Sequence, residues 1–141
     1  MIPSFTGDVV PERDVLACVL SASLISSGAG RRVLARARGT GLEPHYFYYA
    51  SLGGLYDVMC DLADSGDPVD PISIAAEIDR RATDALPLVH GYVDVDQLRA
   101  RLHLLAHEVT AFGVVEHRAR LVVAAWRARQ EASGTEAGRA A

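Results

Sequence analysis

The sequence contains no lysine, so all 14 of its basic residues are arginine. A nucleotide-binding phosphate loop needs a lysine ammonium group that reaches the β- and γ-phosphates. The absence of lysine therefore excludes an ATPase of that class.

Cysteines and long apolar runs are also scarce. Cys18 and Cys60 each lie inside an apolar helical pattern, and we expect buried, reduced thiols rather than a disulfide. No apolar run approaches the roughly 20 residues needed to span a bilayer. The first residues, Met1 to Phe5, lack the charged and apolar regions of a secretory signal. We therefore expect a cytoplasmic protein without membrane association.

The remaining composition is typical of one globular domain. Single domains commonly have about 100–150 residues, and this chain has 141, of which 50% are hydrophobic and 23% are charged. The formal net charge of −4 argues against a protein that coats DNA nonspecifically, because such proteins are usually strongly basic.

Apolar residues recur at spacings of three and four, and no two-residue alternation appears, so we predict an all-α fold, a compact bundle of about six helices. Pro11 and the pair Asp70-Pro71 are suited to the first turns of two helices. Gly53 and Gly54 lie inside a predicted helix and indicate a close-packed neighbour, since each glycine costs roughly 1 kcal/mol relative to alanine. The predicted helices cover residues 11–25, 31–38, 50–63, 71–82 and 112–130, and a further helix is capped by Asp94 or Asp96 and runs to about residue 109. We assign residues 1–10 to a leader, 11–131 to the domain, 83–94 to a loop and 132–141 to a disordered tail.

Two histidines, His103 and His107, are four residues apart on one predicted helix, a spacing that can hold zinc. A zinc protease also needs a glutamate directly after the first histidine, and that position is Leu104. We therefore interpret the pair as part of the polar side of an amphipathic helix. No grouping of nucleophile and base is recognisable, and we predict no enzymatic activity, no metal and no cofactor.

The charges are unevenly distributed. Residues 57–79 hold seven acids and no base, whereas residues 99–129 hold six arginines and two glutamates. One interpretation is two solvated helix faces. The other is an acidic and a basic patch that steer a partner or a second copy of the chain.

Four short motifs occur in a set order. Residues Leu62–Asp70 read Leu-Ala-Asp-Ser-Gly-Asp-Pro-Val-Asp and continue into Ile72–Ile78. The other motifs are Glu12–Leu16, Phe47-Tyr48 followed by Leu55-Tyr56, and Thr110-Ala111 followed by Ala119–Val122. With these four motifs in this order along the sequence, the chain resembles the N-terminal domain of DnaB-family replicative DNA helicases, over roughly residues 11–127. It departs from that family at Leu86–Tyr92, where a Gly-Gly-x-x-Tyr-Leu element is usual, and the RecA-like motor domain has no counterpart in these residues.

The resemblance implies a helical bundle that ends in a helical hairpin formed by the last two helices, within residues 98–131. In the helicases this hairpin pairs with a neighbouring one to build dimers and a collar of six, and the domain contacts primase. Our candidates for the corresponding interface are Leu121, Val122, Ala125 and Trp126, flanked by Arg118 and Arg120. Alternatively, the four apolar residues pack onto their own domain.

We therefore expect a non-catalytic interaction and oligomerisation module of bacterial or phage DNA replication. It would form a homo-oligomer and bind a replicative helicase, a helicase loader or primase. The alternative is a DNA-binding regulator that contacts phosphates through the arginines of the last helix: Arg118, Arg120, Arg127 and Arg129.

Overall fold

The structure, a computed structural model, describes residues 3–82, 95–108 and 112–140, and all regular secondary structure in these ranges is helical. The predicted all-α class is thereby confirmed, while the predicted loop at 83–94 lies outside the described residues. Among the described helices none is long and apolar enough to cross a membrane. The elements in chain order are α1 (Pro3–Ser23), α2 (Ser27–Gly39), η1 (Pro44–Tyr46), α3 (Ala50–Asp64), α4 (Pro71–Ala82), α5 (Val95–Ala106), η3 (Phe112–Val114) and α6 (Val115–Ala140).

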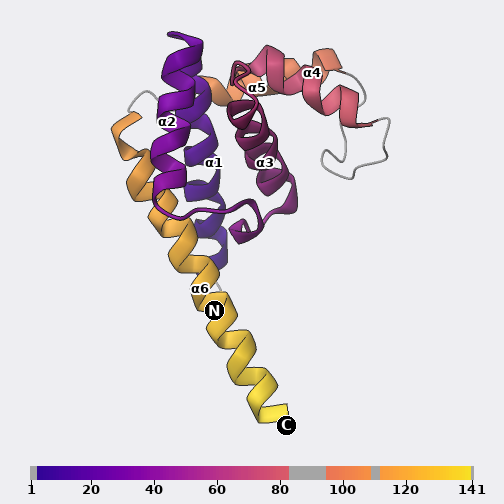
Figure 1. Cartoon of the computed structure of the whole chain (residues 1–141). Coiled ribbons are helices and arrows are strands. Elements are labelled where there is room, and N and C mark those ends of the chain that lie inside the picture. Colours follow the sequence, from indigo (N-terminus) through magenta and orange to yellow (C-terminus); the bar gives the residue numbers. More distant parts are fainter. Residues whose placement is uncertain (1–2, 83–94, 109–111, 141) are drawn as a thin grey trace.

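Helix α1 is the centre of the bundle. Its residues Val15 to Leu20 are all fully buried, including consecutive positions that point to different sides of the helix. A helix that is apolar all round must be covered on every side. Helices α2, α5 and α6 pack against α1 and supply this cover, while α4 and α5 lie across the upper end of the bundle (Figure 1).

The last two helices do not form the expected hairpin with each other. Helix α5 packs against α1 and α4, whereas α6 packs against α1 and α2, and the second half of α6 projects beyond the rest of the molecule (Figure 1). The reason is that the apolar side of each helix is already used. Leu98 and Leu102 of α5, and Val115 and Ala119 of α6, are buried in the common core.

Two predicted helix boundaries are wrong. Helix α1 begins at Pro3 and contains Pro11 in its interior, although residues 1–10 were expected to be a leader. Proline removes one helical hydrogen bond, but its fixed φ is itself helical, so the helix can continue through it. Helix α6 continues to Ala140, through residues expected to form a disordered tail.

The motif Leu62–Asp70 ends α3 and begins α4. The amide of Asp67 donates to the carbonyl of Leu62 at 2.8 Å, and that of Gly66 donates to Ala63 at 3.1 Å. With Gly66 at φ +78° this is a Schellman ending, which favours glycine because the left-handed conformation crowds a Cβ. The Asp70 carboxylate then accepts from the amide of Ser73 at 2.7 Å, as expected of a cap.

The start of α3 is capped from another helix. The carboxylate of Glu12 on α1 accepts hydrogen bonds from the amides of Tyr48, at 2.8 Å, and Tyr49, at 3.3 Å. Glu12 is 1% exposed. Because the N-terminal end of a helix carries free amides and partial positive charge, a buried carboxylate is well placed there.

The predicted burial of the cysteines is confirmed. Cys18 and Cys60 are both buried and neither forms a disulfide, and burial raises the pKa of each thiol to about 11. Both side chains therefore stay protonated and pack as small apolar groups.

Candidate interaction surfaces

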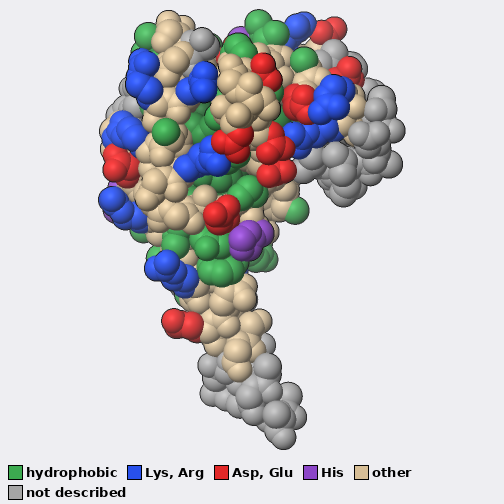
Figure 2. Space-filling view, viewed as in Figure 1, with side chains coloured by type: hydrophobic (Ala, Val, Ile, Leu, Met, Phe, Trp, Pro, Cys, Tyr) green, Lys and Arg blue, Asp and Glu red, His purple; other side chains and the backbone are tan. Residues whose placement is uncertain are grey.

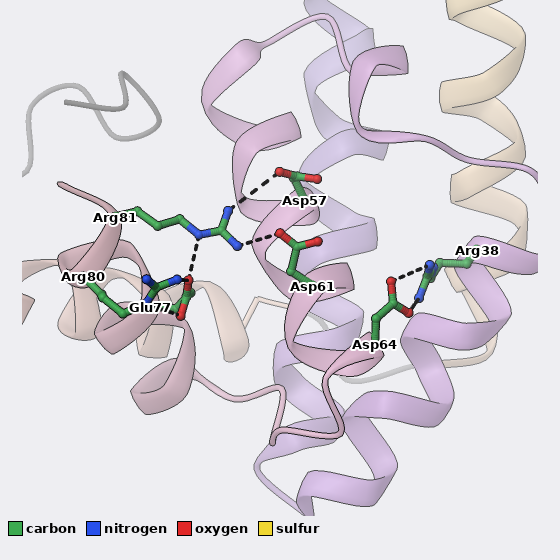
Figure 3. Close-up of polar contacts among 7 residues, drawn as sticks. All are labelled: Arg38, Asp57, Asp61, Asp64, Glu77, Arg80 and Arg81. Carbon is green, nitrogen blue, oxygen red and sulfur yellow. Dashed lines mark hydrogen bonds and ion pairs between the residues drawn. The ribbon is translucent and has the colours of Figure 1, made fainter. Parts of the chain in front are cut away.

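The acidic run of α3 is bound by arginines from two neighbouring helices. Arg81 of α4 reaches Asp61 at 2.6 Å, Glu77 at 2.8 Å and Asp57 at 3.8 Å (Figure 3). Its side chain is only 15% exposed, so solvent screens these pairs less than it screens ordinary surface pairs. Arg81 therefore ties α4 to α3.

Two more arginines complete this network. Arg38 of α2 donates two hydrogen bonds to Asp64, at 2.8 and 3.3 Å, and these hold the pKa of the Asp64 carboxyl below its usual value (Figure 3). Arg80 and Arg81 hydrogen-bond to Glu77 and lower its pKa to about 2. The carboxylates of α3 thus join helices within the chain, which neither interpretation of the acidic run had anticipated. The arginines that bind Asp61 and Asp64 are distant from them in the sequence, so no local sequence pattern predicts these ion pairs.

The structure divides the six predicted interface residues between the core and the surface. Val122 is 2% exposed and belongs to the core, and Arg118 lies with its Nε 3.2 Å from the Asp14 carboxylate of α1. Leu121 is 38% exposed, and Arg120 is exposed with Glu116 3.9 Å away. Ala125 and Trp126 are half-buried.

Trp126 belongs to an aromatic joint between α6 and η1. Its ring stacks on Tyr46 with centroids 4.0 Å apart and an interplanar angle of 13°, and His45 meets it edge-on at 5.6 Å. Arg129 reinforces the joint, because it donates to the carbonyl of Tyr46 at 2.8 Å and lies 5.2 Å from the centre of the Tyr48 ring. No local pattern in the sequence indicates this contact, because Trp126 and Tyr46 are far apart along the chain.

The outward face of α6 is a continuous stripe that the core does not use. Its residues follow one another at spacings of three and four, as expected for one side of a helix. Leu121 is its large apolar residue. The exposed positions are His117, Arg120, Leu121, Ala124, Arg127, Ala128 and Glu131.

A second apolar feature lies between α1, α3 and α5. This is a groove of about 280 Å³, lined mainly by leucines, and the ion pair between Arg13 and Glu108 lies at its rim. Leu104, one of its lining residues, is 70% exposed.

The histidine pair is not arranged as a metal site. The Nδ1 atom of His107 lies 2.7 Å from the carbonyl of His103, so the ring is engaged with the backbone of its own helix. Within the part of the chain that the structure describes, no group of three or more potential ligands could hold a metal ion.

These features place the chain among small all-helical domains whose polar side chains serve mainly to join helices. The model of the DnaB-like helicase N-terminal domain matches residues 12–122. The chain belongs to this family, as the motifs predicted. It is also similar to the crystal structure of the N-terminal domain of DnaB helicase from Mycobacterium tuberculosis, with 26% identity and a TM-score of 0.63, over 84% of this chain and 69% of that one.

Proposed function

We propose that this domain is a non-catalytic interaction module of the DNA replication machinery, which self-associates and binds a replicative helicase, a helicase loader or primase. The observation that carries the proposal is the extent of the family match, from Glu12, which caps α3, to Val122 in the core of α6. The match therefore includes residues that determine the bundle itself, rather than one short motif. The absence of lysine supports a non-catalytic role, because it excludes a phosphate-binding loop.

The surface that we propose for self-association is the outward face of α6. Leu121 would provide the apolar contact, with Arg120 beside it, and the small side chains of Ala124 and Ala128 would allow a second helix to approach closely. Val122, one of the interface residues predicted from the sequence, is buried. It would therefore support this face from the core rather than contact a second helix. Trp126 supports α6 by stacking on Tyr46.

Light scattering after size exclusion, over a range of concentrations, tests the self-association. We expect an oligomer that Leu121→Glu dissociates, because a carboxylate at an apolar contact cannot be desolvated cheaply. Leu104→Glu is the matched control, since Leu104 is more exposed but lies on α5. A monomer at all concentrations, or equal effects of both variants, would contradict the α6 interface.

Binding to a replicative helicase is tested separately. Added in excess to Mycobacterium tuberculosis DnaB helicase, the domain should bind the ring and change its rate of DNA unwinding. A helicase that neither retains the domain nor changes its rate would leave loader or primase as the partner. Failure with purified examples of all three would reject the proposal.

The arginines of α6 do not favour the alternative of DNA binding. Arg118 lies against Asp14, Arg120 near Glu116, and Arg129 is held by the carbonyl of Tyr46. The carboxylates beside Arg118 and Arg120 would repel a phosphate group that approached these two guanidinium groups.

A further inference from the structure

Helix α2 has the largest excess of charge of one sign among the helices. It carries four arginines, Arg31, Arg32, Arg36 and Arg38, and no acid, in a protein whose net charge is −4. All four residues are exposed. Arginine side chains gather along α2 and the neighbouring part of α6 (Figure 2).

A groove of about 390 Å³ runs between α2 and the end of α3. On its α2 side a row of Gly28, Arg31, Ala35 and Arg38 lines the groove, and Arg32 and Leu34 of the same helix also line it. The four positions are separated by three, four and three residues, which is the spacing with which one helix packs along another. Ala35 lies between Arg31 and Arg38 in this row, so a partner backbone can approach closely between two cations.

The arginines of the groove have guanidinium donors that remain available for a partner. Arg31 donates one long hydrogen bond, 3.4 Å, to the carbonyl of Ala63, and Arg38 uses two donors on Asp64. A guanidinium has five donors. Within the described ranges no carboxylate lies at ion-pair distance from Arg32, whose Nη1 atom folds back over Gly28.

We propose that this groove binds an acidic helix of a partner protein, with carboxylates at three- and four-residue spacing that pair with Arg31 and Arg32. Charge complementarity determines the sign of the partner, and the three- and four-residue spacing of the row favours a helix. The surface is distinct from the outward face of α6, so the proposal does not depend on self-association or on helicase binding.

The lining of the groove favours a helix over single-stranded nucleic acid. Strand-binding grooves combine cations with aromatic side chains on which bases stack. No aromatic residue is among the described residues that line this groove, and its apolar side chains are those of Leu34, Ala35 and Ala63. The carboxylate of Asp64 in its wall would repel phosphates, whereas a helix can place an uncharged side chain opposite it.

The test is an NMR titration of the whole chain that follows the Nε–Hε signals of the arginines. The probe is a capped alanine peptide with glutamates at alternating three- and four-residue spacing, and the neutral control has glutamine in their place. We expect the glutamate peptide to shift the Arg31 and Arg32 signals and the glutamine peptide to leave them unchanged. Arg32→Glu should weaken binding about tenfold or more.

Arg99→Glu is the charge-matched control. Arg99 lies on α5, and its ion-pair partner among the described residues is Asp96 of the same helix, so this variant should bind the glutamate peptide as the unaltered chain does. Equal binding of both peptides, or equal loss in Arg32→Glu and Arg99→Glu, would overturn the proposal. So would an oligothymidine strand that shifts the same signals at lower concentration, because the groove would then be a phosphate site.

Discussion

The indole of Trp126 lies flat on the ring of Tyr46, 4.0 Å from centroid to centroid, and this stack attaches the middle of α6 to η1. The contact is made within one chain, by a residue for which the sequence had left open a contact between chains or packing onto its own domain. It thus assigns Trp126 a stabilising role that can be measured directly.

Replacing Trp126 by alanine should lower the free energy of unfolding by about 2 kcal/mol, because it removes a half-buried stack. Urea denaturation followed by circular dichroism measures the change. Trp126→Phe, which can still stack on Tyr46, should retain most of the stability. Equal losses in the two variants would show that the stack contributes little.

Replacing Glu12 by alanine should cost about 2–3 kcal/mol, since the part-buried amides of Tyr48 and Tyr49 would lose their charged acceptor. Glu12→Gln keeps an accepting oxygen without the charge and should cost less, about 1 kcal/mol. Hydrogen exchange gives an independent readout. The Tyr48 and Tyr49 amides should exchange faster in Glu12→Ala, and unchanged exchange would contradict the capping role.

A methyl group at Gly53 should be poorly tolerated. A Cβ there would lie 2.6 Å from the carbonyl oxygen of Pro44 and 3.2 Å from the Cβ of Phe47. We expect Gly53→Ala to destabilise the fold by about 1–3 kcal/mol through forced movement of η1. Gly39→Ala in α2 is the control, because nothing lies within 4 Å of its Cβ position and alanine favours a helix by up to about 1 kcal/mol. A neutral Gly53→Ala would mean that η1 can move away freely.

Acid should destabilise the protein partly through Glu77. Hydrogen bonds from Arg80 and Arg81 lower its pKa from 4.5 to about 2 in the folded state. Between these two pH values the unfolded chain binds more protons at this site, so stability falls as the pH falls through the window. Glu77→Gln should flatten this part of the profile of urea midpoint against pH. Arg99→Met, which removes a cation from α5, should leave the slope unchanged.

Local features were predictable because neighbouring residues determine them. The three- and four-residue spacing indicated the helices, Asp70 indicated a cap, and the Gly53-Gly54 pair indicated a close neighbour, which the structure identifies for Gly53 as Pro44. Pro11 misled the prediction of the helix boundary, because its fixed φ suits the interior of a helix as well as the first turn.

Surface roles were harder to predict, because periodicity shows which side of a helix is apolar but not what covers it. Val122 and Leu121 are adjacent, yet one is in the core and the other faces out. The same holds for charge. Nothing near Asp61 or Asp64 in the sequence indicates that Arg81 and Arg38 bind them, since these pairs form only once α2, α3 and α4 are packed.

The charge on α2 also affects how the domain is oriented as it diffuses toward a partner. With four positive charges on one helix, the rest of the sequence carries −8, so the domain has a permanent electric dipole moment. Its acidic side chains gather mainly over α3 and α4 (Figure 2). Near a charged surface this dipole produces a torque that turns the domain during diffusion, with α2 leading toward anions. At physiological salt the torque acts only within about 8 Å, so orientation is imposed in the last step of approach and disappears as salt is raised.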